Sequence, residues 1–170
     1  MKAIVVYESL WGNTAAVARA VAEGLGPGVP ALPPDEAAGT ALAGVDLIVA
    51  GSPVLAFGLP TDRIREGVRK DPGPKAPRPA DLSHPSLRSW LDALPAGSGR
   101  FAAFETRVRY SPRGATSAIA EKLEKAGYRR LAGDERFVVK GKYGPLRDGG
   151  IERARECGVR LAGDFAQTQG

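Results

Sequence analysis

Short apolar runs alternate with helical patterns along this chain of 170 residues. The β-branched run at 3–7 predicts a strand close to the start of the chain. Val17, Val21 and Leu25 then recur every four residues, and Gly26-Pro27 ends the pattern. Residues 13–25 are therefore predicted to form a helix.

The rest of the chain repeats this alternation. Further buried strands are predicted at 46–51, 101–104 and 137–139, with a weak extended segment at 29–32. Helices are predicted near 36–42, 85–94, 115–126 and 148–166. Strands that are apolar on both faces, with helices between them, indicate an α/β protein with a parallel sheet covered on both sides. Ligands of such sheets bind at the carboxyl ends of the strands.

Residues 71–85 carry five of the fourteen prolines, which excludes a helix or a central strand there. We interpret this segment as an exposed loop, with a lid or a dimer contact as an alternative role. It is too short to separate two domains, so residues 1–170 are predicted to form a single domain.

Composition limits the possible classes of protein. The chain is 43% apolar and 25% charged, which is typical of a globular domain. No stretch reaches the roughly 20 apolar residues of a membrane span, and the acidic Glu8 argues against a signal peptide. One cysteine and one histidine exclude a disulfide framework and a metal site of several soft ligands. A cytoplasmic location is expected.

The net charge of +5 is unevenly distributed. Residues 1–62 hold two basic and six acidic side chains, whereas residues 63–170 hold 22 basic and 13 acidic ones. A basic half can attract an acidic protein partner, an anionic small molecule or nucleic acid, or it can be a solvated surface. No basic motif interleaved with aromatic residues is present, so nucleic acid is not expected as a partner.

The segment after the first strand carries the strongest chemical signal. Ser9 and Thr14 supply hydroxyl groups, Asn13 supplies an amide, and Gly12 allows a close approach of the backbone. These residues lead directly into a helix, whose N-terminal N–H groups favour a phosphate. The segment contains no lysine, so it is not a Walker motif. A monophosphate that is held rather than transferred fits this pattern.

The same residues resemble the signature of the flavodoxin family. Two β-branched residues and then Tyr7, Ser9, Gly12, Thr14, Ala18 and Val21 match every defined position of that signature. The resemblance implies a three-layer sandwich with a five-stranded parallel sheet in the order 2-1-3-4-5, helices on both faces, and bound FMN. It implies that the phosphate is held by the side chains of Ser9, Asn13 and Thr14 and by the backbone of Leu10, Trp11 and Gly12. Trp11 departs from the second threonine that many flavodoxins have.

Two further loops would clamp the flavin ring according to this resemblance. They correspond to residues 51–60 and 105–112, and the implied contacts are Pro53, Val54, Phe57, Thr106, Arg107 and Tyr110. Phe57 and Tyr110 are the candidates for stacking on the ring. The whole chain also resembles a small bacterial group of flavodoxin-domain proteins, whose members often have Thr-His where this chain has Val54-Leu55.

Several other residues are candidates for electrostatic or partner contacts. Arg107, Arg109 and Arg113 are expected to gather beside the ring, where they stabilise reduced flavin, receive an anionic substrate or are simply solvated. Lys142 and Tyr143 lie in a compact turn and are candidate partner contacts, although a structural role is favoured. Cys157 is predicted to be a small core residue and His84 to lie at the surface.

These observations predict an FMN-binding protein that transfers electrons to a redox partner with an acidic docking face. One alternative is an FMN-dependent oxidoreductase acting on NAD(P)H and a quinone-type acceptor. Another is a binding module that has kept the fold and lost the flavin. A monomer or a homodimer is expected, with no residue required as a catalytic acid or base.

Overall fold

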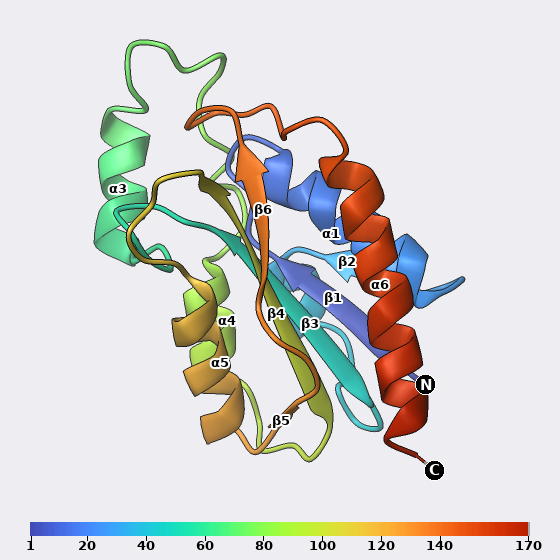
Figure 1. Cartoon of the computed structure of the whole chain (residues 1–170). Coiled ribbons are helices and arrows are strands. Elements are labelled where there is room, and N and C mark those ends of the chain that lie inside the picture. The colour runs from blue at the N-terminus through green and yellow to red at the C-terminus, as the bar shows by residue number, and fades with distance from the viewer. Residues whose placement is uncertain (170) are drawn as a thin grey trace.

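The computed structural model describes residues 1–169, which form a layered α/β structure around one parallel sheet (Figure 1). The strand order is β2-β1-β3-β4-β5, and β6 also pairs with β4. The strands are β1 (Ala3–Tyr7), β2 (Ala31–Leu32), β3 (Leu47–Pro53), β4 (Arg100–Val108), β5 (Arg129–Arg130) and β6 (Glu135–Val139). The expected parallel sheet and its order are confirmed.

The last position of the sheet differs from the prediction of five strands. It holds two short strands, because β5 pairs with Arg100 and Phe101 of β4, and β6 pairs farther along β4 with 104–108. The four intervening residues, 131–134, leave the sheet edge before the chain returns. The sequence pattern missed β5 because both of its residues are exposed arginines with no apolar signal.

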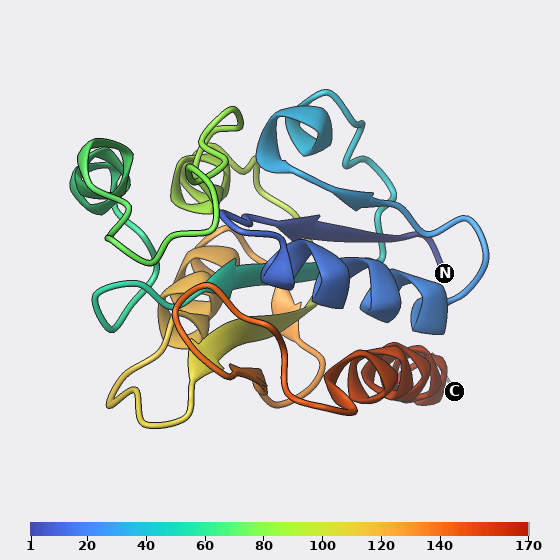
Figure 2. The same cartoon turned by 90° about the horizontal axis from the view of Figure 1, so that it is seen from above.

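Within residues 1–169, six helices cover the two faces of the sheet and one flank (Figure 2). They are α1 (Asn13–Leu25), α2 (Pro34–Ala38), α3 (Asp62–Lys70), α4 (Leu87–Asp92), α5 (Thr116–Lys125) and α6 (Gly150–Gln167). Alternate residues of β1 point to opposite faces: Val5 packs with α1 and α6, and Val6 packs with α2, α4 and α5. The expected three-layer sandwich is therefore present.

The helices α1 and α6 cross closely because each contributes a glycine at the contact. A side chain at Gly24 would collide with the carbonyl group of Arg155, and one at Gly158 would collide with the carbonyl group of Val21. The inner face of α6 buries Ala154, Gly158, Leu161 and Phe165, whereas Ile151 is only half-buried. Cys157 is buried on the same face, as expected.

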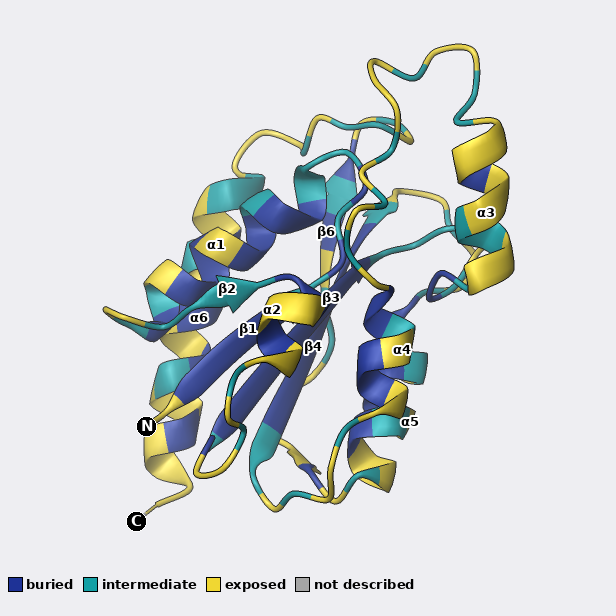
Figure 3. Cartoon of the chain, turned by 180° about the vertical axis from the view of Figure 1, so that it is seen from behind, coloured by how far each residue is buried: buried dark blue, intermediate teal, exposed yellow. Residues whose placement is uncertain are grey.

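Helix α3 was not predicted from the sequence. It is mostly charged and buries only Val68, so it lies at the flank of the molecule with most of its surface exposed (Figure 3). Its start is nevertheless marked locally, because the Thr61 hydroxyl accepts a hydrogen bond from the N–H of Ile64. No helix within residues 1–169 has the length and apolar character needed to cross a membrane.

Two predicted boundaries need correction. Residues 105–108, which were expected to belong to a loop, continue β4 and pair with β6. The polar residues Glu105 and Thr106 are buried within that strand, which accounts for the error. Strand β3 likewise runs on to Pro53, so the sheet reaches farther toward the expected ligand edge than the apolar runs alone indicate.

Candidate functional site

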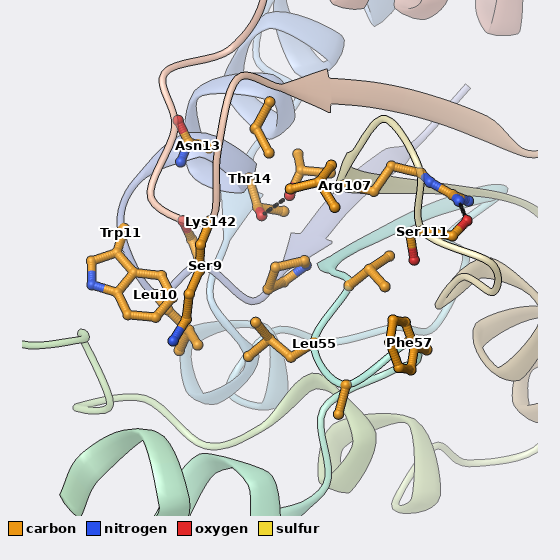
Figure 4. A pocket seen from close by; sticks show the side chains of 16 residues that line it. Ser9, Leu10, Trp11, Asn13, Thr14, Leu55, Phe57, Arg107, Ser111 and Lys142 are labelled. Atoms are coloured by element: carbon orange, nitrogen blue, oxygen red, sulfur yellow. Dashed lines mark hydrogen bonds between the residues drawn. The ribbon is translucent and has the colours of Figure 1, made fainter. Parts of the chain in front are cut away.

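A cavity of about 280 Å³ lies at the carboxyl edge of the sheet, near the lower end of the size range of small-molecule sites (Figure 4). It gathers residues from the ends of β1, β3, β4 and β6. Ten of the twelve residues that the sequence singles out line it: Ser9, Leu10, Trp11, Asn13, Thr14, Pro53, Val54, Phe57, Thr106 and Arg107. Gly12 and Tyr110 are not among the lining residues.

The start of α1 forms the polar end of this cavity. Gly12 has a φ of 97°, a conformation that glycine adopts without strain, and its N–H donates to the Ser9 hydroxyl at 3.1 Å. No side chain within residues 1–169 caps this helix, so its first N–H groups remain available. At the starts of α3, α4 and α5, by contrast, backbone N–H groups donate to side-chain oxygen atoms of Thr61, Ser86 and Glu105.

Two hydrogen bonds attach the start of α1 to distant segments. The hydroxyl groups of Thr14 and Thr106 lie 2.8 Å apart, which joins α1 to the end of β4 (Figure 4). The Asn13 side-chain amide donates to the backbone carbonyl of Tyr143 at 3.0 Å. Three segments that are far apart in sequence therefore hold the polar side chains of the cavity in place.

The proline-rich segment packs against the loop between β1 and α1, residues 8–12, which we call the first loop. The Trp11 indole N–H donates to the carbonyl of Arg78 at 3.3 Å, and the N–H of Asp81 donates to the carbonyl of Leu10 at 2.8 Å. Trp11 also packs edge-to-face against Tyr143, with ring centroids 4.8 Å apart, and the Tyr143 hydroxyl donates to Pro72 at 2.5 Å. The segment 71–85 is thus fastened to the site at several points.

A strained turn forms one side of the apolar end. Leu55 and Gly58 exchange two backbone hydrogen bonds of 3.1 and 3.0 Å, so Ala56 and Phe57 form the tip of a tight hairpin. Both tip residues have positive φ values, 46° and 66°, which non-glycine residues adopt at a cost of about 1–3 kcal/mol each. The turn holds the Phe57 ring at the mouth of the cavity, 59% exposed.

The fully buried Glu105 organises the third loop. One carboxylate oxygen accepts the N–H groups of Ala115 and Thr116 at the start of α5, and the other accepts from Arg107 at 2.8 Å. Arg107 also donates to the carbonyl of Ser111. Its guanidinium is therefore committed to the loop and its charge is compensated.

The expected gathering of arginines beside the cavity is only partly present. Arg107 lines the cavity, whereas Arg109 lies over the ring of Tyr110 at 5.4 Å from its centroid. Tyr110 is 84% exposed and points into solvent, so only a movement of the loop would bring it over a ligand. Arg113 is exposed.

Six lining residues are not among the flavin contacts that the resemblance implies: Leu55, Ala56, Val108, Ser111, Val139 and Lys142. Four of them belong to the two loops expected to clamp the ring, and Lys142 was expected as a partner contact or a structural residue. Lys142 is the most informative of these, because it places a positive charge beside the loop between β1 and α1, which contains no basic residue. Its ammonium group lies 5.6 Å from the centroid of Trp11 and donates to the carbonyl of Pro72 at 3.1 Å. Its place depends on how the β6–α6 turn returns to the sheet, which no local signal shows.

Glu8 is an acidic group buried next to the site. It is 3% exposed, and one carboxylate oxygen accepts from Arg65 at 2.9 Å and from the N–H of Leu87 at 3.2 Å. Burial raises the pKa of Glu8 above its usual range, although the Arg65 guanidinium opposes this shift. The other oxygen atom is buried and has no hydrogen-bond partner within residues 1–169.

The two remaining sequence candidates lie apart from this cavity. Burial raises the pKa of the Cys157 thiol to about 11, which keeps it protonated and unreactive at neutral pH. His84 is half-buried and its Nδ1 lies 2.8 Å from a carboxylate oxygen of Asp35. No cluster of three or more potential metal ligands is found among residues 1–169.

Comparisons with known proteins identify the architecture. No family model and no curated protein sequence matches the chain. Among solved structures, a flavodoxin from the domain Archaea matches with a TM-score of 0.62 and 21% identity, covering 98% of this chain and 99% of its own. Flavodoxin 1 from Bacillus cereus matches with a TM-score of 0.64 and 14% identity, covering 98% of each chain.

A third solved structure, a WrbA-like flavodoxin protein from Agrobacterium tumefaciens, has a TM-score of 0.62 and 20% identity, and the match covers 98% of each chain. The structural match extends over nearly the whole of both chains in all three comparisons. The identities are low, so these likenesses concern the architecture. The chain has the flavodoxin-like fold.

Proposed function

We propose that this protein binds FMN non-covalently in the cavity at the carboxyl edge of the sheet and transfers electrons. The observation that carries this proposal is the polarity of the cavity. Hydroxyl, amide and free N–H groups meet at the α1 end, and apolar side chains from the second and third loops meet at the other. FMN has the same division, with a phosphate at one end and a flat ring at the other.

The phosphate end would be held mainly by neutral donors. Ser9 and Thr14 offer hydroxyl groups, and the first N–H groups of α1 offer backbone donors that no side chain within residues 1–169 uses. The partial positive charge of the helix N-terminus favours the phosphate further. Lys142 adds a full charge beside this end.

The ring end would be enclosed by apolar side chains. Val54, Leu55 and Phe57 come from the second loop, and Val108 continues β4. Each good aromatic contact with a flat ring contributes about 0.5–1.5 kcal/mol beyond its buried area, and Phe57 is the aromatic residue in position to make one. Because Phe57 and Val108 are exposed, one edge of the ring would reach the surface.

Bound FMN would supply the redox chemistry, accepting and releasing electrons at its ring. The residues of this chain anchor it, exclude water from its inner face and set the surrounding charge. Arg109 and Arg113 are exposed near the mouth, and neither pairs with a carboxylate within residues 1–169. We therefore propose a partner with an acidic docking face, with electron transfer that slows as salt is raised.

The low cysteine content fits a cytoplasmic location.

A paired titration tests this function. Quenching of flavin fluorescence is followed while the protein is added to FMN and, separately, to riboflavin, which lacks the phosphate. We expect tighter binding of FMN, and we expect Thr14→Val to weaken FMN binding about tenfold while riboflavin binding changes little. Equal affinity for the two flavins, or no binding of either, would contradict the proposal.

An FMN-dependent oxidoreductase is a second candidate, favoured by the open apolar mouth between Phe57 and Val108. A small acceptor could approach the ring there without a partner protein. Steady-state oxidation of NADPH by the FMN-loaded protein separates the two functions. Turnover with a quinone and no added reductase supports the enzyme, whereas its absence supports a carrier.

A further inference from the structure

A second cavity, of about 290 Å³, lies on the opposite side of the first loop from the proposed flavin site. It is walled by α1, by the segment that joins β2 to α2, by α3 and by the proline-rich segment. Its lining includes the ionisable side chains of Glu8, Arg19, Arg65, Arg78, Asp81 and His84. Ser9 lines both cavities, whereas Glu8 and Gly12 line only this one, so the loop between β1 and α1 separates the two.

The positive groups of this second cavity are not all compensated. Arg65 is fully engaged by Glu8 and by the carbonyl of His84. Arg19 makes no hydrogen bond or ion pair with the rest of residues 1–169. Arg78 donates to the carbonyl of Trp11 at 3.2 Å but pairs with no carboxylate there.

The two carboxylates of this cavity, Glu8 and Asp81, each already accept hydrogen bonds within the protein. Asp81 accepts two hydrogen bonds from Ser83, which lower its pKa together with the nearby charges of His84 and Arg78. His84 is turned toward Asp35. With Glu8 balanced by Arg65, and Asp81 balancing one further charge, one guanidinium remains in excess in this cavity.

Glu8 has an unpaired carboxylate oxygen that needs a hydrogen-bond donor, which an anion without a hydroxyl group does not supply. One of its carboxylate oxygens holds Arg65 and Leu87, but the second is buried without a donor. Unpaired buried oxygens are costly, about 1–3 kcal/mol in protein mutational data, unless a donor is supplied. A hydroxyl group in the cavity would supply it.

We propose that this second cavity is a binding site for a small phosphomonoester that carries a free hydroxyl group. Arg19 and Arg78, from segments 59 residues apart in sequence, bind the phosphate with their guanidinium groups, and the hydroxyl donates to the unpaired oxygen of Glu8. The site is separate from the flavin cavity and does not depend on whether FMN binds.

Calorimetric titration of the full-length protein with glycerol 3-phosphate tests this site. Four proteins are compared: the wild type, Arg19→Met, Arg63→Met and Thr14→Val. Arg19 is exposed on α1, so its replacement leaves the core intact. Arg63 is an exposed arginine of α3 outside both cavities, and its variant removes the same charge. Thr14 lines only the flavin cavity.

We expect saturable binding to the wild type, weakened about tenfold by Arg19→Met and unchanged by the other two substitutions. Equal affinity in the wild type and Arg19→Met would overturn the proposal, as would an absence of saturation. A loss of binding in Thr14→Val instead would place the ligand in the flavin cavity and contradict a second site. None of these outcomes depends on flavin binding, so this inference and the proposed function fail separately.

The role of Glu8 has its own readout. Sulfate carries no hydroxyl donor at neutral pH, so the wild type is expected to prefer glycerol 3-phosphate over sulfate. Glu8→Gln places a donor where the unpaired oxygen lies, and this preference should shrink severalfold. A preference that stays unchanged in a folded Glu8→Gln protein would remove Glu8 from the site.

Discussion

The hydroxyl groups of Thr14 and Thr106 lie 2.8 Å apart, although 92 residues separate them in sequence. One residue opens α1 and the other lies in β4, and both are buried. The contact fixes the polar end of the cavity against the sheet. It also restrains the Thr14 hydroxyl, which the proposed function uses to hold a phosphate.

Thr106→Val should weaken FMN binding without touching the phosphate directly. The change keeps the shape of the side chain and removes the partner of the Thr14 hydroxyl, so we expect affinity to fall severalfold and unfolding stability to fall by about 1 kcal/mol. Fluorescence titration and denaturant unfolding measure the two effects. Thr116→Val, at a buried threonine outside the cavity, is the control. Equal losses in both variants would show a general effect on packing.

Lys142→Met should reduce the affinity for FMN about three- to tenfold and leave riboflavin binding nearly unchanged. The ammonium group of Lys142 places a full positive charge beside the proposed phosphate end. Riboflavin has no phosphate, so removing this charge should not change its binding. Lys140→Met is the matched control, because Lys140 pairs with Asp148 and lies outside the cavity. Equal effects of Lys142→Met on both flavins would contradict a contact with the phosphate.

Tyr143→Phe should loosen the proline-rich segment. The substitution removes the hydrogen bond from the Tyr143 hydroxyl to the carbonyl of Pro72 and keeps the ring that packs against Trp11. We expect faster cleavage by trypsin after Lys75, which lies within this segment, measured by mass spectrometry of the products. An unchanged rate would mean that the contacts of Trp11 and Leu10 suffice to hold the segment.

Cys157 should react slowly with iodoacetamide in the folded protein at pH 8 and rapidly in denaturant, because burial raises its pKa to about 11. A raised pKa also links stability to pH. The contribution of the protonated thiol is complete below the unfolded pKa of about 9 and is lost as pH rises toward 11. The stability gap between the wild type and Cys157→Ala should therefore shrink over that window. A gap that is constant with pH would contradict this shift.

The elements that could be predicted from the sequence are those specified by neighbouring residues in the chain. The first strand, the helix at 13–25 and the loop between them follow from an apolar run, helical spacing and glycine, within twenty-five residues. The strand order followed from the resemblance that this loop carries. Ten of the twelve candidate residues line one cavity because the ends of parallel strands meet at one edge.

The features that sequence did not predict depend on tertiary contacts. Glu105 looked like a loop residue because a carboxylate in a buried strand makes sense only once Arg107 and the start of α5 are beside it. Lys142 reaches the cavity through the return of the β6–α6 turn. Helix α3 buries a single side chain, Val68, so its sequence carries almost no periodic signal.

The decisive test of FMN binding is the visible absorption spectrum of the purified protein, recorded after adding excess FMN and removing the unbound fraction. We predict that flavin bands remain with the protein, with quenched fluorescence, and that Thr14→Val retains less flavin than the wild type under the same conditions. A wild-type protein that emerges colourless would contradict an FMN site at this edge of the sheet.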